Sequence, residues 1–294
     1  MYVSMKPILQ HAHQHNYAVP AINCINMEMA RGAITAAEEL RAAIIINLGV
    51  GQMGNHAHSE EMVPMIKEMA TRVTVPVALN LDHGNRLEDI VRCLNLGFSS
   101  VMIDASSFDF EENVQRTALV SAMAHAMNVC VEGELGHVGQ ANARDDEDAD
   151  LYTNPKQARE FVRRTQVDAL AVAIGTAHGN YLHHKVPRLD FDRLGELKAL
   201  LNMPLVLHGG SGSGDENLRK AVANGINKVN ICTDAFQICK LAFMEAQEQQ
   251  PEMDYMHLCM AVESRMKEFT RHHLEVLGAA ERYVYGETIT DSHE

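Results

Sequence analysis

The sequence predicts a single (β/α)8 barrel, in which eight parallel strands each lead into a helix. Short apolar, β-branched runs alternate with segments of helical spacing eight times along the chain. The length of 294 residues covers the ~250 that such a barrel uses as one domain and leaves room for an added helix. No composition shift or linker divides the chain. One domain of alternating strands and helices is therefore the expected architecture.

The eight expected strands are mostly apolar throughout, as in parallel sheets that helices cover on their outer face. Gly, Pro or Asp residues bound most of them, and these residues interrupt regular structure. The expected strands span residues 19–24, 43–48, 75–81, 100–104, 129–135, 169–174, 204–207 and 228–231.

The segments between the strands carry apolar residues at a spacing of three and four, which is typical of amphipathic helices. The expected helices cover residues 28–40, 59–70, 87–96, 111–126, 156–165, 191–201, 216–224 and 234–248, and an additional C-terminal helix covers 256–277. We expect a barrel domain over residues 1–284 and a polar tail over 285–294. The long connection at 136–154 carries an acidic run at 144–150, and a functional loop and a solvated acidic turn are equally compatible with it.

Composition and charge exclude several classes of protein. The chain is 46% hydrophobic and 22% charged, which excludes disorder, a collagen-like fibre and a small disulfide scaffold. Its 25 Lys+Arg against 39 Asp+Glu give a net charge of −14, which disfavours nucleic acid and anionic membranes as partners. No apolar run approaches the ~20 residues of a membrane span, and residues 1–16 do not form a secretory signal. Six scattered cysteines are typical of reduced thiols, so we expect a cytoplasmic protein.

Reactive side chains gather at the expected C-terminal strand ends, where barrels of this kind build their active sites. Three histidines from different strands, with an open position, are a typical set of ligands for catalytic zinc. A single histidine is more often a core or surface residue, but the shared placement of these three favours a metal site. The expected ligands are His83, His178 and His208.

Two carboxylates fall on neighbouring strand ends. Asp104 and Glu134 are close enough in this arrangement to orient metal ligands or to hold a second cation. Buried structural carboxylates are the competing interpretation. Asp82 directly precedes His83 and can face the cavity without coordinating, which suits a general acid or base. A structural hydrogen bond is the alternative for Asp82.

A glycine-rich segment, 208–214, precedes a helix and adjoins 230–233, which precedes another helix. Backbone N–H groups and helix N-termini bind phosphate, and the loops after strands seven and eight are the usual phosphate site of these barrels. A loop that only turns the chain is the alternative. A Lewis acid, a phosphate anchor and an acid/base carboxylate together suit C–C bond cleavage next to a ketone through an enediolate. The expected phosphate site consists of Gly209, Gly210, Ser211, Asn230, Ile231, Cys232 and Thr233.

At these residues the sequence resembles the class II, metal-dependent ketose-bisphosphate aldolases, and among them the tagatose-bisphosphate aldolases. The matching segments run in order through most of the barrel. They are 17–23, Leu81-Asp82-His83, 100–106, 131–136, 151–155, 170–179, 204–212 and 228–233.

The resemblance implies that His83, His178 and His208 bind the catalytic Zn²⁺ and that Asp82 donates a proton to the oxygen of the leaving aldehyde. It implies that Glu134 lies near the metal, and that Asp104 belongs to an alternative or second metal position. It also places the phosphate of the dihydroxyacetone phosphate half on Gly179 and on the two loops named above. The resemblance also implies a monovalent cation, Na⁺ or K⁺, beside that phosphate. It further implies assembly as a homodimer or homotetramer.

The sequence departs from the family at the rim of the site, where Gly84 follows His83, Gly210 follows Gly209, and 234–237 differ. We expect a reversible cleavage of tagatose 1,6-bisphosphate to dihydroxyacetone phosphate and glyceraldehyde 3-phosphate, with fructose 1,6-bisphosphate or another ketose 1-phosphate as alternatives. No residue is assigned to the distal phosphate, because exposed surface charge is the favoured interpretation of each basic candidate. Those candidates are Arg265, Lys267, Arg271 and Arg282.

Two other classes of function compete with this one. A metal-dependent hydrolase is suggested by the His-x-His at His56 and His58, although such enzymes place the pair on the first strand. A non-catalytic barrel that serves as a partner subunit is disfavoured, because all three histidines and Asp82 are present.

Overall fold

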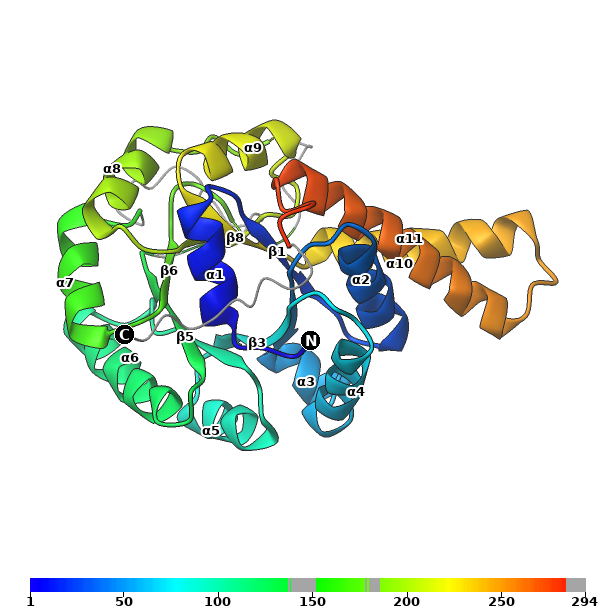
Figure 1. Ribbon diagram of the computed structural model, residues 1–294, viewed down its shortest axis with the longest axis horizontal. Helices are drawn as coiled ribbons and strands as arrows, with labels where there is room; N and C mark the ends of the chain where they lie inside the picture. The colour runs from blue at the N-terminus through cyan, green and yellow to red at the C-terminus, as the bar shows by residue number, and fades with distance from the viewer. Residues whose placement is uncertain (137, 139–151, 178, 180–185, 284–294) are drawn as a thin grey trace.

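Eight parallel strands close into a barrel in the computed structural model, which describes residues 1–136, 138, 152–177, 179 and 186–283. Each strand pairs with the next in the sequence, and β8 pairs with β1 (Figure 1). The predicted fold class is therefore confirmed. The strands are β1 (Val19–Asn23), β2 (Ile44–Gly49), β3 (Val77–Gly84), β4 (Ser100–Ile103), β5 (Cys130–Leu135), β6 (Ala169–Val172), β7 (Leu205–Leu207) and β8 (Ile226–Ile231).

The predicted helices all form, and each of their ends lies within one residue of the expected position. Side chains at their N-terminal boundaries explain several of these ends, since Asn26, Asp109 and Asn154 each accept a hydrogen bond from a backbone N–H of the first turn. These helices are α2 (Met27–Glu39), α4 (Ser59–Thr71), α5 (Leu87–Leu96), α6 (Phe110–His125), α7 (Pro155–Thr165), α8 (Phe191–Leu201), α9 (Asp215–Ala223), α10 (Thr233–Gln249) and α11 (Tyr255–Val276).

Two helices were not expected from the sequence. Helix α1 (Met5–Gln14) is mostly polar, but its apolar residues recur on one face and are buried against β1, β3 and β8. It lies across the barrel in Figure 1 and covers the end opposite the strand C-termini. Helix α3 (Val50–Asn55) follows β2 directly and contains Gly51 and Gly54.

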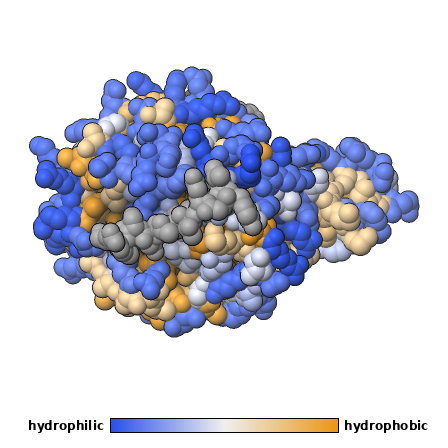
Figure 2. Space-filling view, viewed as in Figure 1, coloured by the Kyte–Doolittle hydropathy of each residue, from blue (hydrophilic) through white to orange (hydrophobic). Residues whose placement is uncertain are grey.

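Helices α10 and α11 extend beyond the barrel as a two-helix arm (Figure 1). Helix α11 returns along α10 and packs against α2. A Cβ atom at Gly32 of α2 would lie 2.7 Å from the carbonyl oxygen of Glu263 in α11, so only glycine allows this approach. The outer part of the arm carries exposed apolar side chains, and Figure 2 shows an apolar area there. They are Leu241, Met244, Tyr255, Met256 and Met260.

No helix among the described residues is long and apolar enough to cross a membrane. The predicted polar tail at 285–294 and the acidic run at 144–150 lie outside the described residues.

Candidate active site

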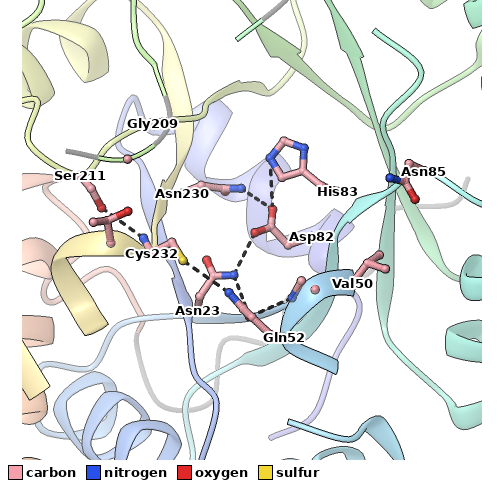
Figure 3. Close-up of a pocket in the computed structure, with 14 residues that line it drawn as sticks. Asn23, Val50, Gln52, Asp82, His83, Asn85, Gly209, Ser211, Asn230 and Cys232 are labelled. Atoms are coloured by element: carbon pink, nitrogen blue, oxygen red, sulfur yellow. Dashed lines mark hydrogen bonds and ion pairs between the residues drawn. The ribbon is translucent and has the colours of Figure 1, made fainter. Parts of the chain in front are cut away.

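A cavity of about 710 Å³ opens at the C-terminal ends of the strands. Asn23, Asp82 and Asn230 reach it from β1, β3 and β8, and the loops that follow β7 and β8 form its rim. Figure 3 shows these side chains pointing toward one another. The cavity therefore lies where the barrel fold places active sites.

Strand β3 is longer than predicted, so that Asp82 and His83 belong to the strand itself. Neighbouring residues on a strand normally point to opposite faces. Here the pairing with β4 shifts between Leu81 and Gly84, and His83 adopts a left-handed φ of 53°. Such a bulge re-aims side chains. It explains how both Asp82 and His83 line the cavity.

Two amides hold the Asp82 carboxylate. Asn23 donates to its Oδ2 and Asn230 donates to its Oδ1, each at 2.9 Å. Burial raises the pKa of Asp82, but electrostatic interactions with His83, His208 and Lys228 lower it by more. The net pKa is lowered, so Asp82 is a carboxylate whose orientation is fixed from both sides.

The rings of His83 and His208 meet edge to face across the cavity floor, with His83 Nε2 2.9 Å from His208 Nδ1. The outer nitrogen of each ring faces a carboxylate. His83 Nδ1 lies 2.8 Å from Asp104 Oδ2, and His208 Nε2 lies 2.8 Å from Glu132 Oε1. Because a carboxylate only accepts hydrogen bonds, each neutral ring carries its proton on the outer nitrogen and presents a lone pair to the other ring.

Two facing lone pairs are stabilised by a cation. Burial lowers the pKa of His83, but Asp82 and the hydrogen bond to Asp104 outweigh burial and raise it to about 10. The surroundings therefore favour positive charge at this point. Histidines that bind metals usually donate the N–H of one ring nitrogen to a carboxylate and direct the other nitrogen toward the metal.

Glu134 lies beside the same pair of rings. Its Oε2 is buried, has no hydrogen-bond partner among the described residues, and lies 3.7 Å from His208 Nδ1. Burial and the charge of Asp104 raise the pKa of Glu134. Ligand atoms of His83, Asp104 and Glu134 all lie within 4.8 Å of one another, as do those of Asp82, His83 and His208. An orphaned carboxylate oxygen and two imidazole lone pairs form a donor set that fits a divalent metal such as zinc.

The two loops predicted to bind phosphate lie side by side at the cavity rim. Gly179, Gly209, Ser211, Cys232 and Thr233 line the cavity together with Asn230. Gly210 and Ile231 are buried behind it, and the N–H of Gly210 donates to the carbonyl of Asn230. The Ser211 hydroxyl accepts from the N–H groups of Cys232 and Asp234, which ties one loop to the other.

Comparison with known proteins identifies the family and agrees with the fold. The family model "Fructose-bisphosphate aldolase class-II" matches residues 3–282. The Escherichia coli K12 protein YdjI is 39% identical over 269 residues, which cover 91% of this chain and 94% of YdjI. The chain belongs to the class II fructose-bisphosphate aldolase family. It is accordingly an aldolase, an enzyme that cleaves carbon–carbon bonds, as its sequence resemblance predicted.

Solved structures agree with the assignment of this chain to the aldolase family. The crystal structure of the YdjI aldolase superposes with a TM-score of 0.85 at 36% identity and covers 97% of this chain and 100% of YdjI. A putative fructose-1,6-bisphosphate aldolase from Coccidioides immitis gives a TM-score of 0.82 at 28% identity. The superposition covers 94% of this chain and 96% of that protein. The fructose-bisphosphate aldolase of Campylobacter jejuni, at 21% identity with 96% of each chain covered, shares the fold with a TM-score of 0.80.

The aldolase fold brings together most of the side chains expected at its site. Asp82, His83 and His208 meet at the cavity floor, with Asp104 and Glu134 beside them. His178, the third expected ligand, lies outside the described residues, although Gly179 lines the cavity.

Sequence reasoning missed three polar residues of the aldolase site. The side chain of Gln52, on the unexpected helix α3, accepts from Asn23 Nδ2 and donates to Cys232 Sγ. Asn23 in turn holds Asp82. Lys228 was counted only as a strand residue, although a lysine inside a predicted buried strand is itself a signal, because such a charge needs a partner.

Gly84 is one of the departures from the family at the rim of the site, and its position argues against a direct contact with the substrate. It is buried beside β4, where an added Cβ would lie 2.7 Å from the carbonyl oxygen of Met102. Among the described residues that line the cavity, Gly84 does not occur. Its small size serves packing behind the bulge.

The basic residues considered for a distal phosphate lie on or after α11, away from the cavity rim. Lys267 and Arg271 both pair with Glu39, and Arg265 pairs with Glu245. Arg282 lies over the ring of Tyr17. These contacts favour the surface-charge interpretation for the basic residues.

The His-x-His motif also lies outside the site, because His56 follows the last residue of α3 and His58 directly precedes α4.

Proposed function

We propose that this aldolase is zinc-dependent and reversibly cleaves a ketose 1-phosphate into dihydroxyacetone phosphate and an aldehyde. The observation that carries the proposal is the 2.9 Å approach of His83 Nε2 to His208 Nδ1, directly beside the Asp82 carboxylate. His83 and His208, with His178 as the third ligand expected from the sequence, would hold the metal. Glu134 and Asp104 would lie next to it.

A bound Zn²⁺ supplies Lewis acidity, which stabilises negative charge developing on the ketose carbonyl oxygen during cleavage. The protein's own residues do the remaining work. Asp104 and Glu132 fix the orientation of the two histidines through their outer nitrogens. Asn23 and Asn230 hold Asp82 at the cavity wall.

Asp82 is proposed to exchange the proton of the substrate hydroxyl that becomes the aldehyde oxygen. Its lowered pKa keeps it ionised, so it can accept this proton during cleavage. In the reverse direction the protonated Asp82 returns the proton to the aldehyde. The enediolate that cleavage leaves behind becomes dihydroxyacetone phosphate after protonation.

The phosphate of the dihydroxyacetone phosphate half is proposed to bind at the two glycine-rich loops. Gly179, Gly209, Ser211 and Thr233 line this side of the cavity. Thr233 begins α10, so the positive end of that helix dipole faces the rim. A monovalent cation, as in the family, would add charge there.

The distal end of the substrate separates two candidates. The sequence favours tagatose 1,6-bisphosphate over fructose 1,6-bisphosphate. A ketose 1-phosphate with an uncharged tail is the second candidate, because no Lys or Arg is found among the described residues that line the cavity. Asn85 and Gln52 line it instead, and amides suit the hydroxyl groups of such a tail.

The exposed apolar side chains of the α10–α11 arm support the homodimer or homotetramer proposed from the family. Patches of this kind often mark protein–protein contacts. A cytoplasmic location is proposed from the six cysteines, all of which are free in the structure.

The proposal is tested by following dihydroxyacetone phosphate release from tagatose and fructose 1,6-bisphosphates and from the two matching 1-phosphates. Release from any of them supports the reaction class. A higher kcat/KM for the bisphosphates supports the first candidate, and a higher kcat/KM for the 1-phosphates supports the second. If none of the four compounds releases dihydroxyacetone phosphate, the result contradicts the proposed substrates.

A further inference from the structure

An ion pair lies inside the barrel beneath the cavity floor. Lys228 Nζ is 2.6 Å from Glu132 Oε2, and both side chains are completely buried. Removing two charges from water is costly, and a buried pair of this kind is often no more stabilising than apolar residues of similar volume. Stability alone is therefore a weak reason for its presence.

The pair crosses the barrel interior, because Lys228 is on β8 and Glu132 is on β5, which are not neighbouring strands. Residues two apart on a strand share a face. Lys228 thus lies one layer below Asn230, and Glu132 lies one layer below Glu134. The ion pair forms the layer directly beneath the proposed metal site.

Hydrogen bonds connect this layer to the metal site. Lys228 donates to Glu132 Oε2, and the second oxygen of the same carboxylate lies 2.8 Å from His208 Nε2. His208 Nδ1 then faces His83. The ring of His208 is completely buried, so its orientation depends on the position of the Glu132 carboxylate.

We propose that Lys228 is a positioning residue for the metal centre: it anchors Glu132 so that His208 directs Nδ1 toward His83. This inference rests on the proposed metal site. Lys228 does not line the cavity among the described residues, so it acts through Glu132 and His208 and not on the substrate. Residues that hydrogen-bond to metal ligands typically change metal affinity by about 10–100-fold when they are lost, and losing Lys228 is expected to act through such a residue, Glu132.

The test measures zinc affinity by chelator competition, and the visible spectrum of the Co²⁺-substituted protein, in wild type and Lys228→Met. Zinc affinity is expected to fall by about 10–100-fold, and the Co²⁺ spectrum is expected to change. The matched control is Lys198→Met. Lys198 is a half-buried lysine that donates to Asn227 Oδ1 at 2.7 Å, and Asn227 directly precedes Lys228 in the sequence. Its loss should leave both readouts unchanged.

A double variant addresses the risk that Lys228→Met leaves a buried carboxylate uncompensated and fails to fold. Glu132→Gln with Lys228→Met removes both charges and still offers His208 an acceptor oxygen. It is expected to fold, as judged by circular dichroism of the metal-free protein, and to bind zinc at least about 10-fold more weakly.

Unchanged zinc affinity and Co²⁺ spectrum in a folded variant would overturn the inference, as would an equal loss in Lys198→Met. Failure of the wild type to bind zinc would instead contradict the proposed function. The two failures are thus distinguishable.

Discussion

His83 Nε2 lies 2.9 Å from His208 Nδ1, and the opposite nitrogen of each ring faces a carboxylate, Asp104 in one case and Glu132 in the other. The two carboxylates direct both imidazole lone pairs to a single point on the cavity floor. Glu134 adds a carboxylate oxygen that has no hydrogen-bond partner in the described part of the chain. Since Asp82 lies beside this point, metal binding and proton transfer can be examined separately by substitution.

Asp82→Asn should lower the rate of cleavage by about 10²–10⁴-fold, because the amide cannot accept the substrate proton. Zinc content should remain near that of the wild type. Steady-state kinetics and metal analysis measure the two effects. Asp89→Asn, at a partly exposed ion pair with Arg86 at the start of α5, is the control and should retain full activity. Joint loss of zinc and activity in Asp82→Asn would make Asp82 a metal ligand.

His208→Ala should lose zinc and activity together, because it removes one of the two facing nitrogens. The matched control is His257→Ala, which removes an exposed histidine that pairs with Asp254 at the start of α11. Metal analysis after dialysis provides the measurement. Wild-type zinc content in folded His208→Ala would exclude His208 as a ligand.

Gly84→Ala should destabilise the protein by about 1–3 kcal/mol, because the new Cβ meets a backbone oxygen and two apolar side chains. Gly195→Ala in α8 is the contrasting change. Apart from its chain neighbours and the backbone of its own helix, no atom of the described residues lies within 4 Å of its added Cβ, and alanine should stabilise that helix by about 0.5–1 kcal/mol. Urea unfolding measures both. A change of substrate preference without loss of stability in Gly84→Ala would contradict the packing role.

Cys93 should make the free energy of unfolding depend on pH in the alkaline range. Burial raises the pKa of its thiol to about 12, whereas an unfolded cysteine titrates near 8.5. Between these values the folded state binds more protons, so the free energy of unfolding falls as pH rises. Relative to Cys93→Ala, the wild type should lose about 2 kcal/mol between pH 8.5 and 10. Urea unfolding under reducing conditions measures this difference, and a pH-independent difference would refute it.

The sequence predicted the barrel well because the local signals agreed with the tertiary structure. Buried parallel strands are apolar throughout, and the alternation with helices leaves few other topologies. Helix α1 was missed because its histidines mask an apolar stripe formed by Met5, Ile8, Leu9 and Ala12. Helix α3 was missed because it is short and contains glycine, which favours loops.

The site was predictable only in part, and the reason is geometric. Strand ends located Asp82, His83 and His208, but the alternation rule alone would send Asp82 and His83 to opposite faces. The bulge that turns both inward depends on the pairing of β3 with β4, which is a tertiary property. The contact between Lys228 and Glu132 likewise joins residues 96 positions apart across the barrel, and no local pattern encodes it.

The most direct test of metal-dependent aldol cleavage is dihydroxyacetone phosphate release before and after treatment with a chelator, followed by added Zn²⁺. We expect chelation to abolish release and zinc to restore it in the wild type but not in His208→Ala. Undiminished release from protein that metal analysis shows to be free of metal would contradict a metal-dependent cleavage.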